Sequence, residues 1–349
     1  MNPYILSILL STLGLGTTIT FASTNWMFAW MGLEINTLAI LPLMAQSHHP
    51  RAVEATTKYF LTQATAAATI LFASTTNAWL TGQWDISLMT HPVPTTIIIL
   101  ALSLKLGLAP LHTWLPEVLQ GLDLTTGLIM STWQKLAPLS LLLQIPFNNQ
   151  PILIMLALAS TLVGGWGGLN QTQTRKILAY SSIAHLGWMM LIVQFVPSLT
   201  LLALITYIIM TSAAFLTLKN TDSKNINSLA TAWANAPALT ALFPLILLSL
   251  GGLPPLTGFM PKWLILQELT KQGLPAIATF AALTALLSLY FYLRLSYAMA
   301  LTISPNNTAG LTPWRLTTTK GTALLSVSVA LTLFLLPLTP AIVPLLALN

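Results

Sequence analysis

Three ionisable side chains lie inside apolar stretches of this sequence. They are Glu34 in LEINTLAILP, Lys105 in LSLKLGLAP and Lys135 in STWQKLAP. A charged side chain at the centre of a bilayer costs at least about 2.5–3.5 kcal/mol, so such residues face one another or water and mark paths for ions or protons. A buried lysine beside a carboxylate holds or releases its proton according to their separation. The residue types therefore indicate a proton relay.

The three residues are predicted to share one depth in the membrane. At 1.5 Å per residue, Glu34 lies about 13 Å and Lys105 about 12 Å from the ends of spans that enter from the same side. Lys135, on a span of opposite direction, also falls near the centre. The alternative for Glu34 and Lys105 is a static buried ion pair that fixes helix packing. Lys135 has no equally obvious partner, which favours a functional role.

Three further residues are candidate proton-transfer stations, each with a structural alternative. Lys262, in FMPKWLILQEL, either takes part in transfer or extends to the membrane surface as a helix-end lysine. His112, in APLHTW, either passes a proton at neutral pH or caps freed carbonyls. His185, in AYSSIAHLGW, lies beside two serines that can order water, or is a neutral histidine bonded to a backbone carbonyl.

The elements that must position these residues are membrane spans. The chain has 349 residues, 55% hydrophobic and 6% charged, with a mean hydropathy of +0.78; a soluble domain carries about 25% charged residues. Apolar runs of roughly the 20 residues needed to cross a bilayer recur throughout. The lack of cysteine excludes disulfides, thiolate zinc sites and iron–sulfur ligation, and the histidines and acidic residues do not cluster as haem or metal ligands do.

We predict an all-α, polytopic membrane protein with about eleven transmembrane helices. The ninth span is too long for one straight helix and contains GGLPPLTGFMP, so we expect two half-helices around a break. The fourth, with Pro110 and Pro116, is expected to break similarly. The predicted spans are residues 3–21, 25–45, 56–80, 97–120, 124–145, 151–170, 175–195, 198–217, 237–272, 275–300 and 323–346.

An internal repeat relates the two breaks. GLAPLHTWLPEVL, from Gly107, aligns with GLPPLTGFMPKWL, from Gly252, with identity at the glycine, two prolines and three leucines at an offset of 145 residues. Each repeat then holds five spans, and an odd number inverts the second copy. Inverted repeats with a broken helix in each are the architecture of secondary transporters; chance similarity of Leu-, Gly- and Pro-rich segments is the alternative. We predict half-channels at 1–148 and 149–300, followed by a loop and a C-terminal helix at 301–349.

The basic residues predict the orientation, and the net charge of +6 reflects their place in loops rather than affinity for nucleic acid. The loops on the side of the N-terminus hold most of them, whereas the opposite loops hold little besides Lys271. By the positive-inside rule the N-terminus is inside and the C-terminus outside. The residues on the inner side are Arg51, Lys58, Arg175, Lys176, Lys219, Lys224, Arg315 and Lys320. The N-terminal stretch lacks signal- or transit-peptide character and is interpreted as the first span.

Taken together, KLGLAPLHTWLPEVLQG, AYSSIAHLGW and LSLGGLPPLTGFMPKW identify a family. Along its whole length the chain resembles the antiporter-like subunits of mitochondrial NADH:ubiquinone oxidoreductase, respiratory complex I, of vertebrate type. The resemblance implies that Glu34 and Lys105 form a coupled pair, that Lys135 links the half-channels and that Lys262 is the station toward the other side. It also implies that His112 and His185 join the hydrated path between them.

The resemblance further implies a place in a larger enzyme, the proton-translocating NADH:ubiquinone reductase, and a need for this chain in assembly of its membrane arm. NADH, FMN, iron–sulfur clusters and ubiquinone would be used on other subunits, with no cofactor here. The partners would be other membrane-arm subunits, including neighbouring antiporter-like ones, and membrane lipid. The chain would be encoded in mitochondrial DNA and lie in the inner mitochondrial membrane, with its N-terminus in the matrix and its C-terminus in the intermembrane space.

Two other functions compete with a proton channel inside a redox-driven complex. One is an autonomous cation/proton antiporter, which would exchange ions by itself in liposomes. The other is a structural membrane subunit whose buried charges are relics, in which case neutralising any one of them would leave pumping intact.

Overall fold

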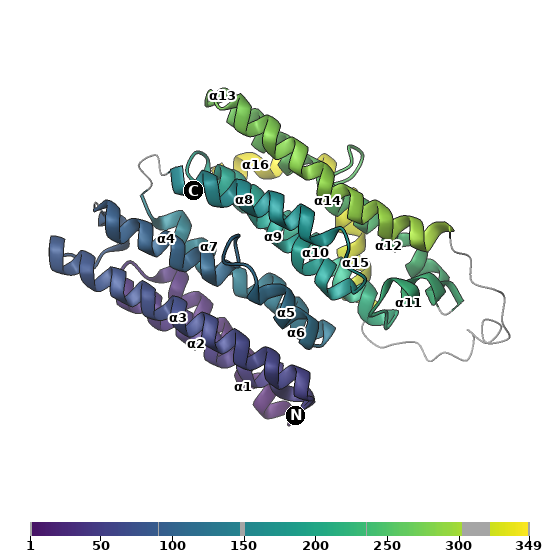
Figure 1. Ribbon diagram of the computed structural model, residues 1–349, viewed down its shortest axis with the longest axis horizontal. Coiled ribbons are helices and arrows are strands. Elements are labelled where there is room, and N and C mark those ends of the chain that lie inside the picture. Colours follow the sequence, from purple (N-terminus) through teal and green to yellow (C-terminus); the bar gives the residue numbers. More distant parts are fainter. Residues whose placement is uncertain (1, 90, 147–150, 235, 302–321, 348–349) are drawn as a thin grey trace. The chain divides into compact units, whose positions relative to one another are not determined.

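The structure is a computed structural model that describes residues 2–89, 91–146, 151–234, 236–301 and 322–347. These residues form helices and turns, with no strand among them, which confirms the all-α prediction. The chain divides into two compact units, Met1–Ala157 and Leu158–Asn349. The first runs from purple to teal in Figure 1 and the second from teal to yellow.

The first unit is a bundle of long helices and shorter half-helices. It contains α1 (Pro3–Ala22), α2 (Trp26–Met44), α3 (Pro50–Thr81), α4 (Pro92–Leu106), α5 (Trp114–Gly121), α6 (Leu124–Thr132) and α7 (Leu136–Gln144). Short 3₁₀ turns lie at η1 (Ala45–Ser47), η2 (Ile86–Leu88) and η3 (Trp133–Lys135). Helix α2 packs between α1 and α3, and α4 contacts α3 and α7.

The second unit is built around α9 and α10. Nearly every residue of α9 (Thr174–Ile192) is buried, and α10 (Pro197–Asn220) contacts α9, α12, α13, α15 and α16. Helix α8 (Pro151–Gly168) crosses the division between the units. The remaining helices are α11 (Ile226–Ala230), α12 (Pro237–Gly251), α13 (Phe259–Lys271), α14 (Pro275–Leu301), α15 (Thr322–Phe334) and α16 (Thr339–Ala347), with 3₁₀ turns η4 (Thr231–Ala234) and η7 (Leu336–Leu338).

Both predicted breaks are present and have the same local geometry. Helices α4 and α12 begin and end 145 residues apart, as do the starts of α5 and α13. Gly107 and Gly252 end the first half-helices with φ of +81° and +82°, a conformation that glycine adopts without a steric cost. The backbone N–H of each glycine donates to the carbonyls three and four residues earlier, as in a helix C-terminal cap. The repeat predicted from sequence is thus a repeat in structure at the breaks.

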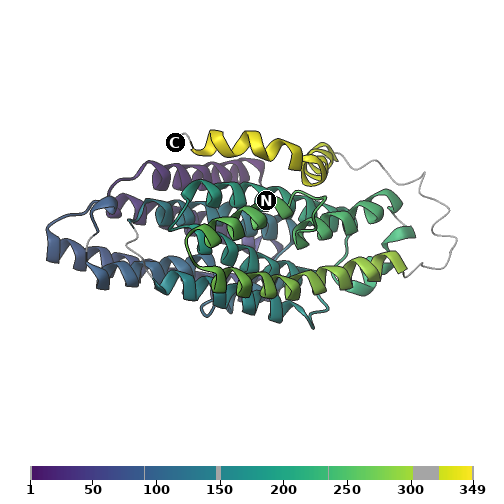
Figure 2. The same cartoon turned by 90° about the horizontal axis from the view of Figure 1, so that it is seen from above.

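Two predicted spans are interrupted where no break was expected. The fifth is divided by η3 into α6 and α7. The last is divided into α15 and α16, whose axes differ by 66°, and Figure 2 shows the bend in yellow. The predicted loop ahead of it, residues 302–321, lies outside the described residues.

Within the described ranges, five helices are each long and apolar enough to cross a membrane, namely α1, α2, α8, α10 and α14, and the bent pair α15 and α16 would be a sixth if it forms one span. Helices α4 and α12 are apolar but short, because each is the first half of a broken span. Helices α3 and α9 begin with charged residues that lower their hydropathy. The described chain is therefore a polytopic membrane protein with both straight and interrupted spans.

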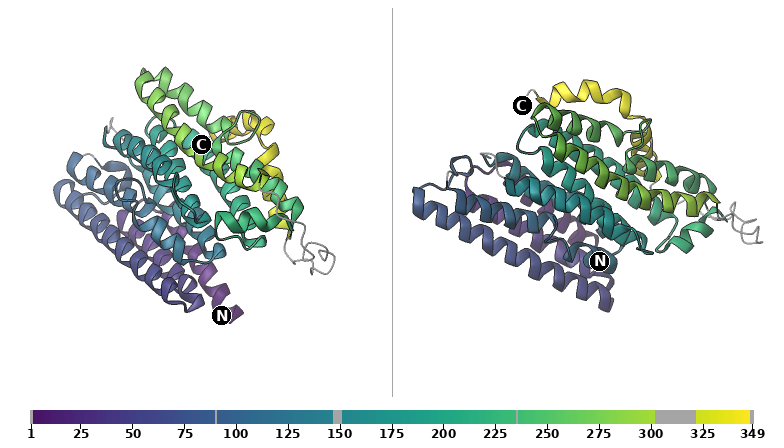
Figure 3. Two further views of the ribbon diagram at one scale, coloured as in Figure 1. Left: turned by 45° about the vertical axis from the view of Figure 1, so that its right-hand side comes forward. Right: turned by 45° about the horizontal axis from the view of Figure 1, so that its top comes forward.

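Small residues bring α1 and α2 together, and Figure 3 shows both beside α3 as near-parallel rods. A Cβ atom added to Gly32 would lie 2.7 Å from Cγ2 of Thr20 and 2.9 Å from the carbonyl oxygen of Gly16. Such close backbone approach through small residues is typical of helices in membranes, where dispersion contacts replace the hydrophobic effect.

Candidate functional site

Lys105 lies in the last turn of α4, immediately before the first break. Its side chain is buried, and among the described residues its Nζ atom has no hydrogen-bond partner. The carbonyl end of a helix carries a partial negative charge, which favours a cation in its last turn. The break therefore places the ammonium group near the carbonyl end of α4, whose partial negative charge offsets part of the cost of burying a positive charge.

Glu34 lies on α2, half-buried, close to this lysine without touching it. The single hydroxyl hydrogen of Thr37 is shared between the backbone carbonyl of Glu34, at 2.8 Å, and its carboxylate, at 3.0 Å. The carboxylate lies within electrostatic range of Lys105 and of the buried Tyr59. Among the ion pairs of the described residues, none within 4.0 Å joins Glu34 to Lys105. The two groups thus lie within electrostatic range of each other without forming a contact ion pair.

A small cavity of ≈ 20 Å³ connects Lys105 to Lys135. That volume is enough for about one water molecule. Its walls come from α2, α3, α4, α5, α6, η3 and α7, all in the first unit. The lining residues are Leu33, Asn36, Thr37, Tyr59, Gln63, Lys105, Leu106, Trp114, Leu115, Met130, Gln134, Lys135, Ala137 and Pro138. Both predicted lysine stations of this unit therefore face the same space.

The turn η3 carries Lys135 into this cavity, and its side chain is buried. Pro138 follows four residues after Gln134, so the Gln134 carbonyl cannot receive the usual helical hydrogen bond and the proline ring crowds it. This accounts for the interruption of the predicted fifth span. The side-chain nitrogen of Gln134 donates a separate hydrogen bond to the backbone carbonyl of Asn36 on α2, at 3.4 Å.

Helix α5 is fastened to its neighbours on both sides of the break. The indole nitrogen of Trp114 donates to the carbonyl of Leu104 at 3.0 Å, so α5 is bonded to the turn of α4 that holds the lysine. The Trp114 ring lies 5.8 Å from that of Tyr59 on α3, centroid to centroid. The half-helix is thereby held against both α3 and α4.

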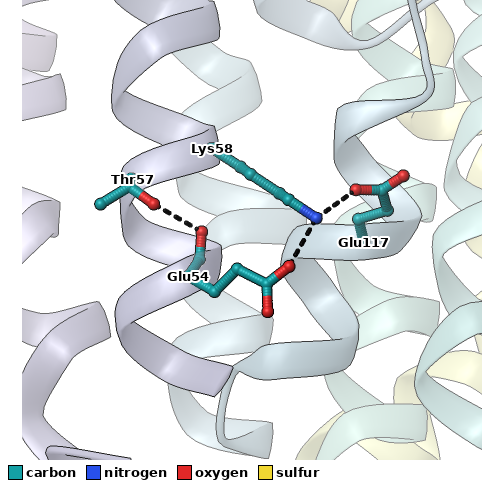
Figure 4. A network of polar contacts seen from close by, with 4 residues as sticks. All are labelled: Glu54, Thr57, Lys58 and Glu117. Atoms are coloured by element: carbon teal, nitrogen blue, oxygen red, sulfur yellow. Dashed lines mark hydrogen bonds and ion pairs between the residues drawn. The ribbon is translucent and has the colours of Figure 1, made fainter. Parts of the chain in front are cut away.

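An ion network holds the same half-helix through an exposed carboxylate of its first turn (Figure 4). The Lys58 ammonium on α3 lies 2.7 Å from the carboxylate of Glu54 and 2.8 Å from that of Glu117 on α5. The pKa of the Glu54 carboxyl is lowered, chiefly by the hydrogen bond from Lys58. Exposed pairs of this kind contribute little energy each, so the network acts mainly on geometry.

His112 lies on the turn between α4 and α5, half-buried. Its side chain is hydrogen-bonded to the backbone of Pro110. It does not line the cavity that joins Lys105 and Lys135. The structure thus places this predicted station at the break but outside the shared cavity.

In the second unit, Lys262 folds back onto the end of α12. Its Nζ atom donates to the Gly251 carbonyl at 2.8 Å and approaches that of Leu250 at 3.5 Å. The side chain bonds to a helix end and is half-buried, so it does not simply extend to the membrane surface.

Each unit thus holds an ammonium group at the end of its first half-helix. The lysines that supply the two groups are not aligned with each other in the repeat. At the offset of 145 residues, Lys105 corresponds to Leu250 and Lys262 corresponds to Glu117. Lys105 belongs to the last turn of the first half-helix, whereas Lys262 reaches back from the second. In both cases the positive charge lies at the carbonyl end of the first half-helix, where the helix dipole favours it.

His185 lies in the buried middle of α9. Its ring centroid is 5.5 Å from that of Tyr207 on α10, which is fully buried. The Tyr207 hydroxyl is hydrogen-bonded to the side chain of Ser182. The hydroxyl groups of Ser181 and Ser182 donate to carbonyls of their own helix, those of Leu178 and Ala179.

Sequence reasoning identified the charged residues and missed the polar ones around them. Asn36, Gln63 and Gln134 line the cavity, and Tyr207 contacts His185. These polar residues could have been noticed in the sequence because each has a side-chain amide or hydroxyl group within a predicted span. No group of three or more histidine or acidic side chains suited to a metal occurs among the described residues.

An apolar, all-helical chain with interrupted helices and ammonium groups at the breaks defines a polytopic membrane protein of the ion-translocating class. A family model described as "NADH:quinone oxidoreductase/Mrp antiporter, TM" matches residues 23–288. A second, "NADH dehydrogenase subunit 2 C-terminus", matches residues 289–343. The chain belongs to this family of antiporter-like NADH dehydrogenase subunits.

Curated relatives extend along the whole chain. NADH-ubiquinone oxidoreductase chain 2 of Salmo salar is 71% identical over 349 residues, which is 100% of both chains. The protein of the same name from Danio rerio is 67% identical over 343 residues, or 98% of this chain and 99% of the relative.

Solved structures share the fold. A chain of respiratory complex I from Thermus thermophilus, with bound aureothin, superposes with a TM-score of 0.86 at 29% identity, covering 98% of this chain and 80% of that one. A chain of the Mrp complex from Dietzia sp. gives a TM-score of 0.82 at 18% identity, covering 97% and 76%. The second likeness concerns the fold alone.

Proposed function

We propose that this chain is a core membrane subunit of respiratory complex I and carries protons across the membrane while electrons pass from NADH to ubiquinone. The observation that supports this most directly is the cavity lined by both Lys105 and Lys135, with Glu34 in electrostatic range of the first. Membership of the antiporter-like family supplies the context for that geometry.

In the proposed mechanism, the separation between Glu34 and Lys105 sets how tightly the lysine holds its proton. A carboxylate that moves closer stabilises the ammonium form, and one that moves away lets burial favour release. Release is directed toward Lys135, because the two lysines face the same cavity. Lys262 is the station of the second unit, and His112 and His185 serve as intermediate carriers.

The surroundings of the chain follow from its family. We place the chain in the inner mitochondrial membrane, with the N-terminus in the matrix and the C-terminus in the intermembrane space. Other membrane-arm subunits and lipid are the proposed partners. The flavin, the iron–sulfur clusters and the sites of NADH and ubiquinone belong to other subunits.

The test is Lys105→Met in the intact complex, with Lys271→Met as control. Lys271 is an exposed lysine of α13 that pairs with Glu268 on its own helix and does not line the cavity, so its loss removes a charge away from it. We expect Lys105→Met to reduce the protons pumped per NADH oxidised, or coupled turnover, in sealed vesicles by at least about tenfold, which is about 1.4 kcal/mol. Native electrophoresis establishes that both variants assemble.

An unchanged proton-to-electron ratio at unchanged rate in Lys105→Met would make the lysine a structural charge. Proton exchange by the isolated chain in liposomes would instead show an autonomous antiporter.

A further inference from the structure

Two uncharged side chains that line the cavity with Lys105 are buried and have amide atoms with no hydrogen-bond partner among the described residues. Among the described residues, both amide atoms of Asn36 and the amide nitrogen of Gln63 lack hydrogen bonds, as does the Lys105 Nζ atom. The exposed fractions of these side chains are 2%, 3% and 6% respectively. A buried polar group left unpaired costs about 1–3 kcal/mol. All three residues line the cavity that reaches Lys135, so one small occupant can serve several of these groups.

The chemistry of the lining limits what that occupant is. The Gln63 amide nitrogen and the Lys105 ammonium are donors, so the occupant must accept hydrogen bonds from both. The Thr37 hydroxyl gives its hydrogen toward Glu34 and has lone pairs left to accept one. A cation is excluded by two lysines in the wall. At ≈ 20 Å³ the cavity suits a single water, which needs two to four polar partners.

We propose that Gln63 and Lys105 bind one ordered water in this cavity, with Asn36 in its wall, and that Gln63 is the residue that positions it. The water oxygen accepts from the Gln63 amide nitrogen and from Lys105. The evidence that a water binds here is the cavity and the polar atoms that line it. The part of this water in proton transfer rests on the proposed function. In transfer, an N–H bond of Lys105 breaks and an O–H bond forms, while the water gives a different proton to an unprotonated Lys135 and is regenerated.

The first measurement is an experimental density map of the intact complex at a resolution that shows water. We expect one peak within hydrogen-bond distance of the Gln63 amide nitrogen and Lys105 Nζ, and its loss in Gln63→Met, which keeps the length of the side chain but removes the amide. Absence of the peak from the unaltered protein overturns the proposal. So does a peak that exchanges for bromide, because the occupant is then a halide.

The second measurement compares Gln63→Met with Asn77→Leu. Asn77 lies on the same helix, α3, is fully buried, and does not line the cavity, and neither of its amide atoms has a partner within the described part of the chain. A purely structural effect of removing a buried amide is therefore shared by the two variants. We expect Gln63→Met alone to slow coupled proton pumping at least threefold and to change the solvent deuterium isotope effect on turnover, with both variants assembled.

The outcomes separate this proposal from the proposed function. If Gln63→Met pumps as the unaltered complex does while Lys105→Met does not, the positioning role of Gln63 is wrong and the proton path stands. If the water peak is present but Lys105→Met pumps normally, the site binds water and the proton path is wrong.

Discussion

At the residue scale, the first unit combines a buried ammonium group with a carboxylate that does not touch it. A contact ion pair between Glu34 and Lys105 would hold the proton in one place, because separating buried opposite charges is costly. The Glu34 carboxylate shares the Thr37 hydroxyl hydrogen with its own backbone carbonyl, and Lys105 faces the cavity. A relay requires groups whose interaction changes with small movements, and this spacing supplies that condition.

Replacing Thr37 tests whether the carboxylate needs this hydrogen bond. Thr37→Val keeps the shape and removes the donor, which costs about 1 kcal/mol for a half-buried charged acceptor. We expect coupled turnover to fall about twofold to fivefold, whereas Thr37→Ser, which keeps the hydroxyl, stays near the original rate. Equal rates in Val and Ser variants, measured as NADH oxidation with proton uptake in sealed vesicles, would show that the bond has no part in coupling.

The charged members of this site were predictable because charge inside an apolar run is conspicuous and helix geometry converts position into depth. The rise per residue of a helix predicted the same membrane depth for Lys105 and Lys135, and the two residues line one cavity. The neutral amides of Asn36 and Gln63 were not predicted. Sequence shows that such residues lie in a span but not which direction they face, so their convergence emerges only from packing.

At the element scale, broken helices and close helix pairs determine where the polar groups lie. The glycine and proline pattern predicted the segments that hold both breaks, and the structure adds that Gly107 and Gly252 end the half-helices with φ of +81° and +82°, which glycine adopts freely. Pro138 alone did not indicate η3, because Pro42 in α2 and Pro244 in α12 lie inside uninterrupted helices. The bend between α15 and α16 depends on packing around a proline-rich segment, so no single residue indicated its size.

The contact between α1 and α2 gives a test with a matched control on the same helix pair. In Gly32→Ala the new methyl group meets Thr20 and the Gly16 carbonyl, and such overpacking costs about 1–3 kcal/mol. In Gly14→Ala it meets nothing within 4 Å, and the higher helix propensity of alanine stabilises α1 by up to about 1 kcal/mol. We expect opposite shifts in the thermal inactivation temperature of the complex. A stabilised Gly32→Ala would contradict the packing described.

At the scale of the whole molecule, the positive-inside argument gives the protein an orientation. The exposed Gln46 and Gln83 lie just beyond the two ends of α3, whose 32 residues extend about 48 Å at 1.5 Å per residue. That length exceeds the roughly 30 Å of a hydrocarbon core. The two residues are therefore expected on opposite sides of the membrane.

Because the chain has no cysteine, a single introduced thiol reports its own location in this subunit. We expect Gln46→Cys to react with a membrane-impermeant thiol reagent only from the matrix side, and Gln83→Cys only from the other. Labelling is read on the band of this subunit in inside-out and right-side-out vesicles. Reaction of both from one side would show that α3 does not span the bilayer, and the reversed pattern would invert the proposed orientation.

The lysine at each break is carried by a different half-helix in the two halves of the chain. One half supplies its ammonium from within the first half-helix and the other supplies it from the second, yet both charges lie at the same carbonyl end. The two breaks therefore share the location of a charge, although a different position of the repeat carries it in each half. An alignment of the two halves by sequence pairs Lys105 with a leucine. From that alignment alone, the buried lysine at the break would be judged to be missing from the second half.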